Sequence, residues 1–291
     1  MEVHQELELV SHFANNPELE KRGFKYGFVC IADALGTKGS WRRKEPYRYF
    51  DQLNKIHKFL RKQKDKQKEK KRKGKDFHYN YSFYTFSDTI ILIMECRNDD
   101  DLFIVDKLVH LSHLISSFFI GAMLGGTYYR GAISQGFYIQ DSEKFVGPAI
   151  DEAAEYYVEK YDWMGITFTP SVNKLIKSMG KRSILVDYIN LFPDLKYRYS
   201  MIDYSIPSKD GKYFDGNVVN WPKTLTHFLE SSEPEIISKF SELTGKQFSP
   251  RDWLVAHFKS SVTPDSENKY KKTIDFYDYC IQNRDHWIPK K

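Results

Sequence analysis

Short apolar runs divide the first half of the chain into strand-like segments. Residues 25–32 and 89–94 are unbroken runs of aliphatic, β-branched and aromatic side chains, which are typical of strands buried in a sheet. Residues 81–86 precede the second run, and Ser87-Asp88 between them predicts a hairpin. A further strand is predicted over residues 127–138, where small side chains allow a neighbouring element to approach closely.

Helical periodicity fills the intervals between these runs. Apolar residues three and four positions apart predict amphipathic helices over residues 47–60 and 99–124, and Gly125-Gly126 marks the end of the second. Another helix is predicted from Pro148 to about residue 158, because proline is favoured in the first helical turn. The order strand, helix, hairpin, helix, strand predicts a ferredoxin-like α+β core.

The remaining patterns extend this core toward the C-terminus. Asp210-Gly211 and Asp215-Gly216 predict turns. Residues 223–291 hold helical patterns separated by prolines, which predict a helical C-terminal appendage to a domain of residues 1–222. The core of that domain covers about residues 24–220. Shorter elements are also predicted, namely strands over residues 163–169, 183–192 and 197–206 and a helix over residues 171–179.

The composition is that of a globular protein, with 41% hydrophobic and 29% charged residues. Three widely separated cysteines argue against a disulfide framework and lack metal-binding spacing. The first ten residues are acidic and lack the basic flank and apolar segment of a signal peptide. The longest apolar stretch, about residues 111–124, is too short to span a bilayer. We therefore expect a cytoplasmic protein with no membrane partner.

Positive charge is concentrated in one segment. The formal net charge is +5, but residues 61–75 alone carry ten basic and two acidic side chains, so the rest of the chain is slightly acidic. Lysines alternating with polar residues fit a solvated helix end or loop. The segment has no interleaved aromatic residues, so a nucleic-acid partner is the weaker interpretation.

Two carboxylates accompany the apolar runs. Asp33 directly follows one predicted strand, and Asp88 lies in the hairpin before another. A carboxylate beside buried strands needs a partner, because burying an unpaired charge costs several kcal/mol. One interpretation is a helix cap or turn for Asp33 and a hairpin turn for Asp88. The other is that both are metal ligands on neighbouring strands.

The order of elements and the motifs resemble the class III nucleotidyl cyclases over roughly residues 24–220. In that family the first strand ends in a turn that carries one aspartate, and the hairpin carries a second. A later strand is followed by a helix of the pattern Gly-x-x-x-Asn-x-Ala-x-Arg. The matching segments here are Asp33-Ala34-Leu35-Gly36-Thr37-Lys38, Phe86-Ser87-Asp88-Thr89, Arg130-Gly131-Ala132-Ile133-Ser134-Gln135-Gly136 and Gly147-Pro148-Ala149-Ile150-Asp151-Glu152-Ala153-Ala154.

The resemblance implies a metal-dependent enzyme that makes a 3′,5′-cyclic nucleotide and pyrophosphate. Two Mg²⁺ or Mn²⁺ ions would be held by Asp33, Ala34 and Asp88, since these hard ions prefer oxygen ligands. Asp33 and Asp88 would be the catalytic residues. Backbone amides of residues 36–38, that is Gly36, Thr37 and Lys38, would bind phosphate oxygens. The family resemblance also implies a homodimer whose active sites are shared between subunits.

Two positions differ from the purine cyclases of the family. The place of a purine-selecting lysine, four residues before Asp88, holds Tyr84, and the second base-selecting position holds Lys144. A larger aromatic side chain favours a smaller base, and a lysine can donate to a pyrimidine carbonyl. The chain therefore looks most like the bacterial pyrimidine cyclases of the Pycsar anti-phage systems. This resemblance implies UTP or CTP as substrate and cyclic UMP or cyclic CMP as an alarm signal.

The family's transition-state asparagine and arginine fall on Asp151 and Glu155. Asp151 could instead bind the ribose. Another cation would have to stabilise the leaving pyrophosphate, and the candidates are Lys38, Arg42, Arg43, Lys44 and Arg130. Two alternatives stay open beside the pyrimidine cyclase. One is a purine cyclase of the same fold, which would differ only in the base pocket around Tyr84 and Lys144. The other is a catalytically silent nucleotide-binding protein, which the missing arginine suggests.

Overall fold

The structure is a computed structural model of the 291-residue chain. It describes residues 21–35, 47, 50–51, 54–62, 65, 79, 81–96, 101–141, 144–181, 200–231, 238, 241–242, 249–259 and 267–283. The predicted strand over residues 183–192 lies outside the described residues.

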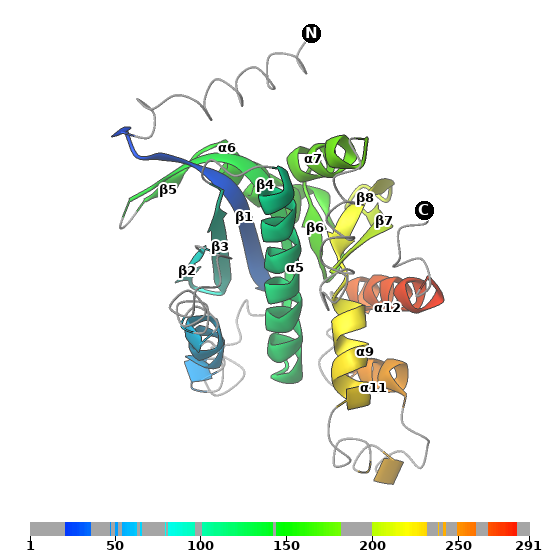
Figure 1. The fold of residues 1–291 in the computed structure, drawn as a ribbon. Coiled ribbons are helices and arrows are strands. Elements are labelled where there is room, and N and C mark those ends of the chain that lie inside the picture. The colour runs from blue at the N-terminus through cyan, green and yellow to red at the C-terminus, as the bar shows by residue number, and fades with distance from the viewer. Residues whose placement is uncertain are drawn as a thin grey trace.

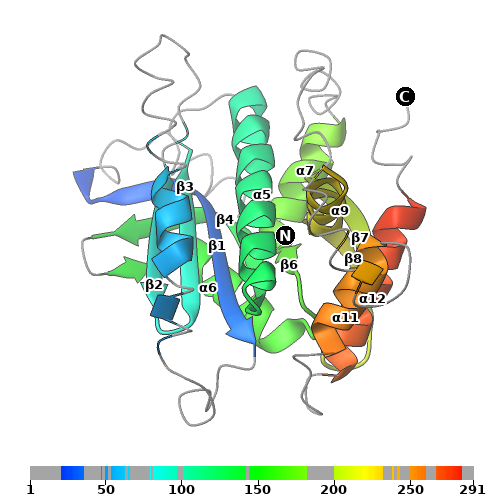
Figure 2. The same cartoon turned by 90° about the horizontal axis from the view of Figure 1, so that it is seen from below.

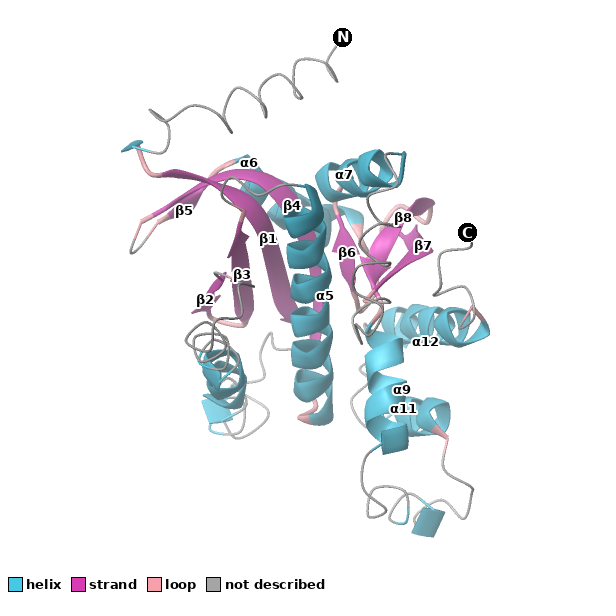
Figure 3. Ribbon diagram, in the orientation of Figure 1, coloured by secondary structure: helices cyan, strands magenta, loops and turns pink. Residues whose placement is uncertain are grey.

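One mixed sheet runs through the protein (Figures 1 and 3). Its strand order is β2-β3-β1-β4-β6-β8-β7, with β5 paired to β4. Every neighbouring pair is antiparallel except β4 and β6, which are parallel. The bounds are β1 Phe24–Leu35, β2 Tyr81–Phe86, β3 Thr89–Glu95, β4 Tyr128–Gln140, β5 Phe145–Val146, β6 Ile166–Phe168, β7 Met201–Pro207 and β8 Tyr213–Val219.

The first four strands in this order confirm the predicted ferredoxin-like core. β1 lies between β3 and β4, and the hairpin β2–β3 occupies one side. A helical segment over residues 54–62 follows β1, and helix α5 (Asp101–Leu124) connects β3 to β4. Both contribute buried side chains to the same hydrophobic cluster as the sheet, and in Figure 2 they lie in front of the strands, to the left and right of β1.

The two faces of β1 pack against different helices because side chains alternate along a strand. Phe28, Cys30 and Ala32 belong to the cluster of buried residues that α5 shares. Val29 and Ile31 point to the opposite face, where they pack with helix α6 (Pro148–Glu155). Asp33 follows the same alternation as Val29 and Ile31, so it lies on the α6 face.

Helix α6 begins close to β4 because of Gly147. This residue has a φ of 138°, and a Cβ there would lie 2.8 Å from the carbonyl oxygen of Phe137. Only glycine accommodates both the positive φ and the close approach. Pro148 follows in the first turn, as predicted. The helix then changes at Tyr156 into a π-helical turn, η1 (Tyr156–Lys160), where the sequence predicts a continuous α-helix.

The turn prediction at Asp215-Gly216 is wrong. Both residues lie within β8, opposite Tyr204 and Ser205 of β7, and the chain reverses instead at Asp210-Gly211 as predicted. A glycine fits at this position of the strand because Asn173 of helix α7 (Pro170–Lys181) packs closely against it. A Cβ on Gly216 would lie only 3.1 Å from Asn173 Nδ2. The glycine thus provides room for a neighbour rather than a turn.

The helices that follow β8 are α9 (Trp221–Ser231), α11 (Pro250–Lys259) and α12 (Glu267–Gln282), in agreement with the predicted helical C-terminal part. They contribute buried residues to the same hydrophobic cluster as α5 and the sheet. Trp221 stacks on Phe119 of α5 with ring centroids 5.2 Å apart. The division of the chain at residues 222 and 223 stays a prediction.

The sequence predicts an apolar stretch over residues 111–124 that is too short to span a bilayer, but among the described residues the helical stretch Leu102–Leu124 of α5 is long and apolar enough to cross one. However, 72% of its most apolar window is buried within the protein. That burial fits the core helix of a globular fold, because the apolar side chains already have protein neighbours.

Candidate active site

The structure brings Asp33 and Asp88 together at one end of neighbouring strands. Asp33 pairs with Thr89 across the β1–β3 ladder, so Asp88 lies one residue beyond that pair, in the turn of the hairpin. Ala34 N–H donates a hydrogen bond to the carbonyl oxygen of Asp88 at 3.2 Å. The hairpin turn is therefore fastened to the end of β1.

The two carboxylates interact electrostatically. The pKa of Asp33 is raised, first by burial and then by the negative charge of Asp88. A hydrogen bond that Thr89 Oγ1 donates to Asp33 Oδ1 at 3.1 Å opposes this rise, as does the positive charge of Arg130. Asp33 is thus a half-buried carboxylate next to a like charge, an arrangement that a bound cation would stabilise.

These oxygen donors fit a divalent metal ion. Ala34 adds a backbone carbonyl on the hairpin side, because the N–H and C=O of one residue point the same way in an extended strand. Among the residues that the structure describes, no group of three or more His, Cys, Asp or Glu side chains could hold a metal. Mg²⁺ commonly uses one or two carboxylates and takes its other ligands from water and substrate phosphates. The donor set therefore fits an ion that binds together with a phosphorylated substrate.

Arg130 lies beside the carboxylates, on β4. It pairs with Asp33 across the β1–β4 ladder, with Nη2 4.0 Å from Asp33 Oδ2. Its side chain is only 17% exposed, and its buried Nε has no hydrogen-bond partner. Buried polar groups are normally hydrogen-bonded, so this unpaired donor is a feature that a ligand could explain.

Tyr157 also lies at the site, and the sequence interpretation did not assign it there. It lies in the π-helical turn η1, and the charges of Asp33, Arg130 and Asp88 all act on it. Burial raises its pKa most, Asp33 raises it further, and Arg130 and a hydrogen bond with Thr89 lower it. Helical periodicity assigns Tyr157 to the apolar side of its helix, and it does pack with that cluster. Helical periodicity accounts for the packed ring of Tyr157, but it does not predict that its hydroxyl lies near the carboxylates.

Tyr84 lies on the same face of the sheet, farther along the hairpin. Its ring packs on Phe145 of β5 with centroids 4.1 Å apart, and Gln140 of β4 donates a hydrogen bond to its hydroxyl. Lys144 is exposed, next to Phe145, in the turn that joins β4 and β5. Tyr84 therefore contacts Phe145 and Gln140, and Lys144 is the exposed neighbour of Phe145 in the sequence.

Asp151 and Glu155 lie on the exposed side of α6. Asp151 is in the first turn of the helix, and Glu155 Oε1 forms an ion pair with Lys160 Nζ at 3.3 Å. The charges that shift the pKa of Asp33 are those of Asp88 and Arg130. Tyr157, rather than Asp151 or Glu155, is the residue of this segment that faces the carboxylates.

Several predicted residues lie outside the described part of the chain, so their roles stay predictions. They are the phosphate-binding residues after Asp33 and the cations of the following segment, namely Gly36, Thr37, Lys38, Arg42, Arg43 and Lys44.

Two solved structures of bacterial light-regulated adenylyl cyclases are distantly similar to the chain. One has a TM-score of 0.37 and 10% sequence identity, and the match covers 68% of this chain and 91% of that chain. The other has a TM-score of 0.33 and 12% identity, with 68% of this chain and 53% of that chain covered. No protein-family model and no curated protein matches the sequence.

Proposed function

We propose that the protein is a metal-dependent nucleotidyl cyclase that converts a pyrimidine nucleoside triphosphate, UTP or CTP, to its 3′,5′-cyclic monophosphate and pyrophosphate. The observation that carries the proposal is the pairing of Asp33 and Asp88 at the end of β1 and the β2–β3 hairpin. Two adjacent carboxylates with nearby basic and hydroxyl groups are what a nucleotide with divalent ions requires.

In this reaction the 3′-oxygen of the nucleotide forms a bond to its own α-phosphorus, and the bond from that phosphorus to the pyrophosphate oxygen breaks. Two Mg²⁺ or Mn²⁺ ions would supply charge that lowers the pKa of the 3′-hydroxyl and neutralises the phosphates. Asp33, Asp88 and the backbone of Ala34 would hold them. Thr89 fixes the orientation of the Asp33 carboxylate through its hydrogen bond at 3.1 Å.

The surroundings of Tyr84 support a pyrimidine as the base. Phe145 and Gln140 hold the tyrosine ring on the face that carries Asp33, so the ring takes up volume there. A purine would need that volume for its second ring. Lys144, at the border of this region, could donate to a pyrimidine carbonyl, and Asp151 could bind the ribose.

The cellular role that we propose is synthesis of a cyclic pyrimidine nucleotide as an alarm signal during phage infection, by a cytoplasmic homodimer. This part rests on the motifs that resemble the Pycsar cyclases. Residues of the second subunit would complete each active site, as the family resemblance implies.

The experiment that tests the function separates the alternatives. Purified protein is incubated with Mn²⁺ and, in turn, ATP, GTP, CTP and UTP, and the products are resolved by mass. We expect cyclic product from UTP or CTP, and loss of that product in Asp33→Asn and Asp88→Asn. Asp151→Asn, a carboxylate on the exposed side of α6, measures the contribution of the proposed ribose contact.

The other outcomes have definite meanings. Cyclic product from ATP or GTP alone would make the protein a purine cyclase. Nucleotide binding without any cyclic product would make it a silent nucleotide-binding protein, and either result would overturn the proposal.

A further inference from the structure

A cavity of about 620 Å³ lies between the helical segment over residues 54–62, helix α5 and helix α9. Apolar side chains form most of its wall, and each of the three elements contributes a ring, namely Phe59, Phe118 and Phe228. Pockets that bind small molecules typically have volumes of about 300–1,000 Å³ and a mostly apolar lining. The cavity therefore has the size and the lining of a ligand site.

Gly121 of α5 leaves part of this space open. A Cβ built on Gly121 would meet no neighbouring atom of the described residues within 4 Å. Close packing therefore does not require a glycine here, in contrast to Gly147. The end of the helix does not require it either, because Gly126 provides the positive φ, 79°, that follows the last turn. Glycine is unfavourable within a helix, so its presence fits a ligand that uses the space a side chain would fill.

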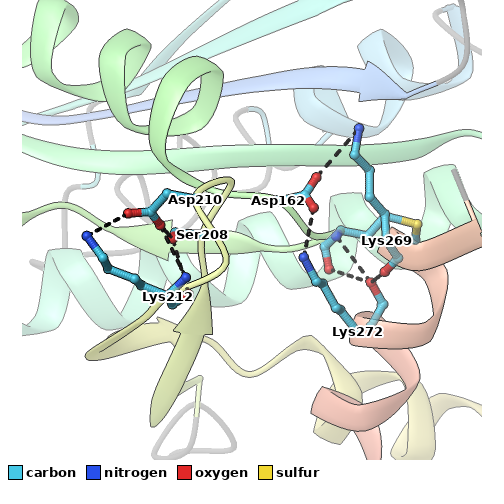
Figure 4. Close-up of polar contacts among 8 residues, drawn as sticks. Asp162, Ser208, Asp210, Lys212, Lys269 and Lys272 are labelled. Carbon is cyan, nitrogen blue, oxygen red and sulfur yellow. Dashed lines mark hydrogen bonds and ion pairs between the residues drawn. The ribbon is translucent and has the colours of Figure 1, made fainter. Parts of the chain in front are cut away.

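The walls formed by α5 and α9 are fixed by contacts outside the cavity. Trp221 packs α9 on α5, and the hydroxyls of Thr226 on α9 and Tyr277 on α12 form a hydrogen bond of 3.0 Å. Helix α12 is held in turn by Lys272, whose Nζ donates to Asp162 Oδ2 at 2.7 Å (Figure 4). These walls are thus formed before any ligand binds, which lowers the cost of ordering the site.

The dimensions and the polarity of the cavity indicate what occupies it. One turn of an α-helix fills about 420 Å³, for a diameter of about 10 Å and a pitch of about 5.4 Å, so the cavity is too small for two turns of a partner helix. Its two charged lining residues, Asp51 and Lys55, are exposed and of opposite sign at helical positions four residues apart, so they offset each other. Ser117 and Thr224 provide hydroxyls for hydrogen bonds. These features fit a small, uncharged and mostly apolar molecule.

The helical segment that lines the cavity is bonded to the hairpin that carries Asp88. His57 Nε2 and Thr85 Oγ1 form a hydrogen bond of 3.1 Å. Tyr81 donates a second hydrogen bond, from its hydroxyl to the carbonyl oxygen of Leu60 at 2.9 Å. Both hairpin residues lie on β2, directly before the turn. A ligand that contacts this segment therefore acts on an element that is attached to the hairpin.

Phe118 connects the cavity to the other side of the candidate active site. The centroid of its ring lies 4.9 Å from that of Tyr129 on β4. Tyr129 pairs with Ala34 across the β1–β4 ladder and directly precedes Arg130. The cavity is thus in contact, through one side chain, with the strand that faces Asp33.

We propose that this cavity binds a small, uncharged, mostly apolar molecule, and that the bound molecule acts on the candidate active site through the β2–β3 hairpin and β4. A ligand in the cavity would fasten the helical segment to α5. The hairpin, which is bonded to that segment, would then open less often. The inference goes beyond the proposed function, because it concerns a second site and requires no particular nucleotide.

The first test is a fluorescence titration with N-phenyl-1-naphthylamine, an uncharged apolar probe. We expect saturable binding of one molecule per chain by the wild type. Gly121→Trp should bind at least about tenfold more weakly, because the indole fills the open space. Gly121→Ala adds only a methyl group and should keep binding. Ser178→Trp, which places the same ring at an exposed position of α7, is the matched control.

Thermal unfolding of each variant checks that the fold is kept. If Gly121→Trp is destabilised, Phe228→Ser takes its place. Phe228 is 36% exposed, so its replacement removes one wall of the cavity at little cost to the core, and binding of the probe should weaken again.

Hydrogen exchange with and without the probe tests the action on the active site. In the wild type we expect amides of the hairpin turn, residues 86–89, to exchange at least about threefold more slowly when the probe is bound. This change should be absent in Gly121→Trp. In Thr85→Val, which keeps the shape of the side chain and removes the hydroxyl bonded to His57, the probe should still bind but the change at the turn should be smaller.

Each other outcome overturns a stated part of the inference. No saturable binding by the wild type, or unchanged binding in Gly121→Trp, would overturn the ligand site. Loss of self-association in Gly121→Trp without any binding of the probe would assign the cavity to a second copy of the chain. Binding without slower exchange at the hairpin would overturn the action on the active site. Absence of cyclic product from every nucleotide would remove the proposed function and leave this inference in place.

Discussion

Arg130 faces Asp33 across the β1–β4 ladder, with Nη2 4.0 Å from Oδ2. The separation is too long for a hydrogen bond, so the interaction is between charges. Arg130 lowers the pKa of Asp33, while burial and Asp88 raise it. The guanidinium therefore partly compensates a site that carries two carboxylates, and it competes there with any metal cation.

Replacement of Arg130 tests this double role. In Arg130→Gln we expect Mn²⁺ to bind at least as tightly as in the wild type, because a competing cation is gone. The cyclase kcat/KM should fall by about 100-fold or more, because one cation near the phosphates is lost. Calorimetry with Mn²⁺ and product analysis by mass measure the two effects. Arg251→Gln, which removes an exposed pair with Asp278, is the control, and equal kinetics in both variants would contradict the prediction.

Asp33→Asn should separate metal binding from folding. Asp33 has a raised pKa, so its charged form is destabilised in the folded protein, and the neutral variant should melt at a temperature equal to or higher than the wild type at pH 7 without metal. With Mn²⁺ at 100 times its Kd, the wild type should gain about 2.7 kcal/mol and the variant little. Thermal unfolding with and without Mn²⁺ checks this. Equal gains in the two proteins would remove Asp33 from the metal site.

The space filled by Tyr84 should control the size of the base. Tyr84→Ala removes the ring that packs on Phe145, so we expect the ratio of purine to pyrimidine product to rise at least about tenfold. Tyr84→Phe keeps the ring and removes only the hydroxyl that accepts from Gln140, so it should keep the pyrimidine preference. Competition assays with mixed nucleotides measure the ratio. An unchanged ratio in Tyr84→Ala would place base selection elsewhere.

His113 on α5 should make the stability depend on pH. Burial, and then the charge of Lys223, lower its pKa from 6.5 to about 4 in the folded protein. Between these two values the unfolded chain binds the proton and the folded protein does not, so stability falls as the pH is lowered from 6.5 to 4. The largest loss is about 3 kcal/mol.

Denaturant unfolding at pH 7, 5.5 and 4.5 measures this dependence. His113→Gln should lose less stability over this range than the wild type, while His227→Gln, at an exposed position of α9, should follow the wild type. A slope that is the same in all three proteins would exclude His113 as its source.

The sequence predicts the part of the site that depends on local pattern. The apolar runs around Asp33 and Asp88 specify strands, and the short hairpin allows few registers, so the neighbourhood of the two carboxylates could be inferred. The ladder position of Asp33 opposite Thr89 agrees with that expectation. The alternation of side chains also places Tyr84 on the face of Asp33.

Other features depend on contacts that no local pattern records. Tyr157 faces Asp33 from a π-helical turn, and the sequence around it reads as a continuous α-helix. The sequence predicts a turn at Gly216, although this glycine lies in β8, where its small size leaves room for Asn173 of α7. Helix α12 packs on the segment before β6 through contacts such as Lys272 with Asp162, which lie more than one hundred residues apart in the sequence.

Trp221 has a consequence for the dissection of this protein into parts. The centroid of its ring lies 5.2 Å from that of Phe119 on α5 and 6.0 Å from that of Phe276 on α12. Trp221 therefore packs between α5 and the last helix. Truncation after residue 222 would expose this ring and the buried face of α5 to water. We expect such a fragment to aggregate, and the intact chain to unfold in one cooperative transition, since α5, the sheet and helices α9, α11 and α12 share one cluster of buried hydrophobic residues.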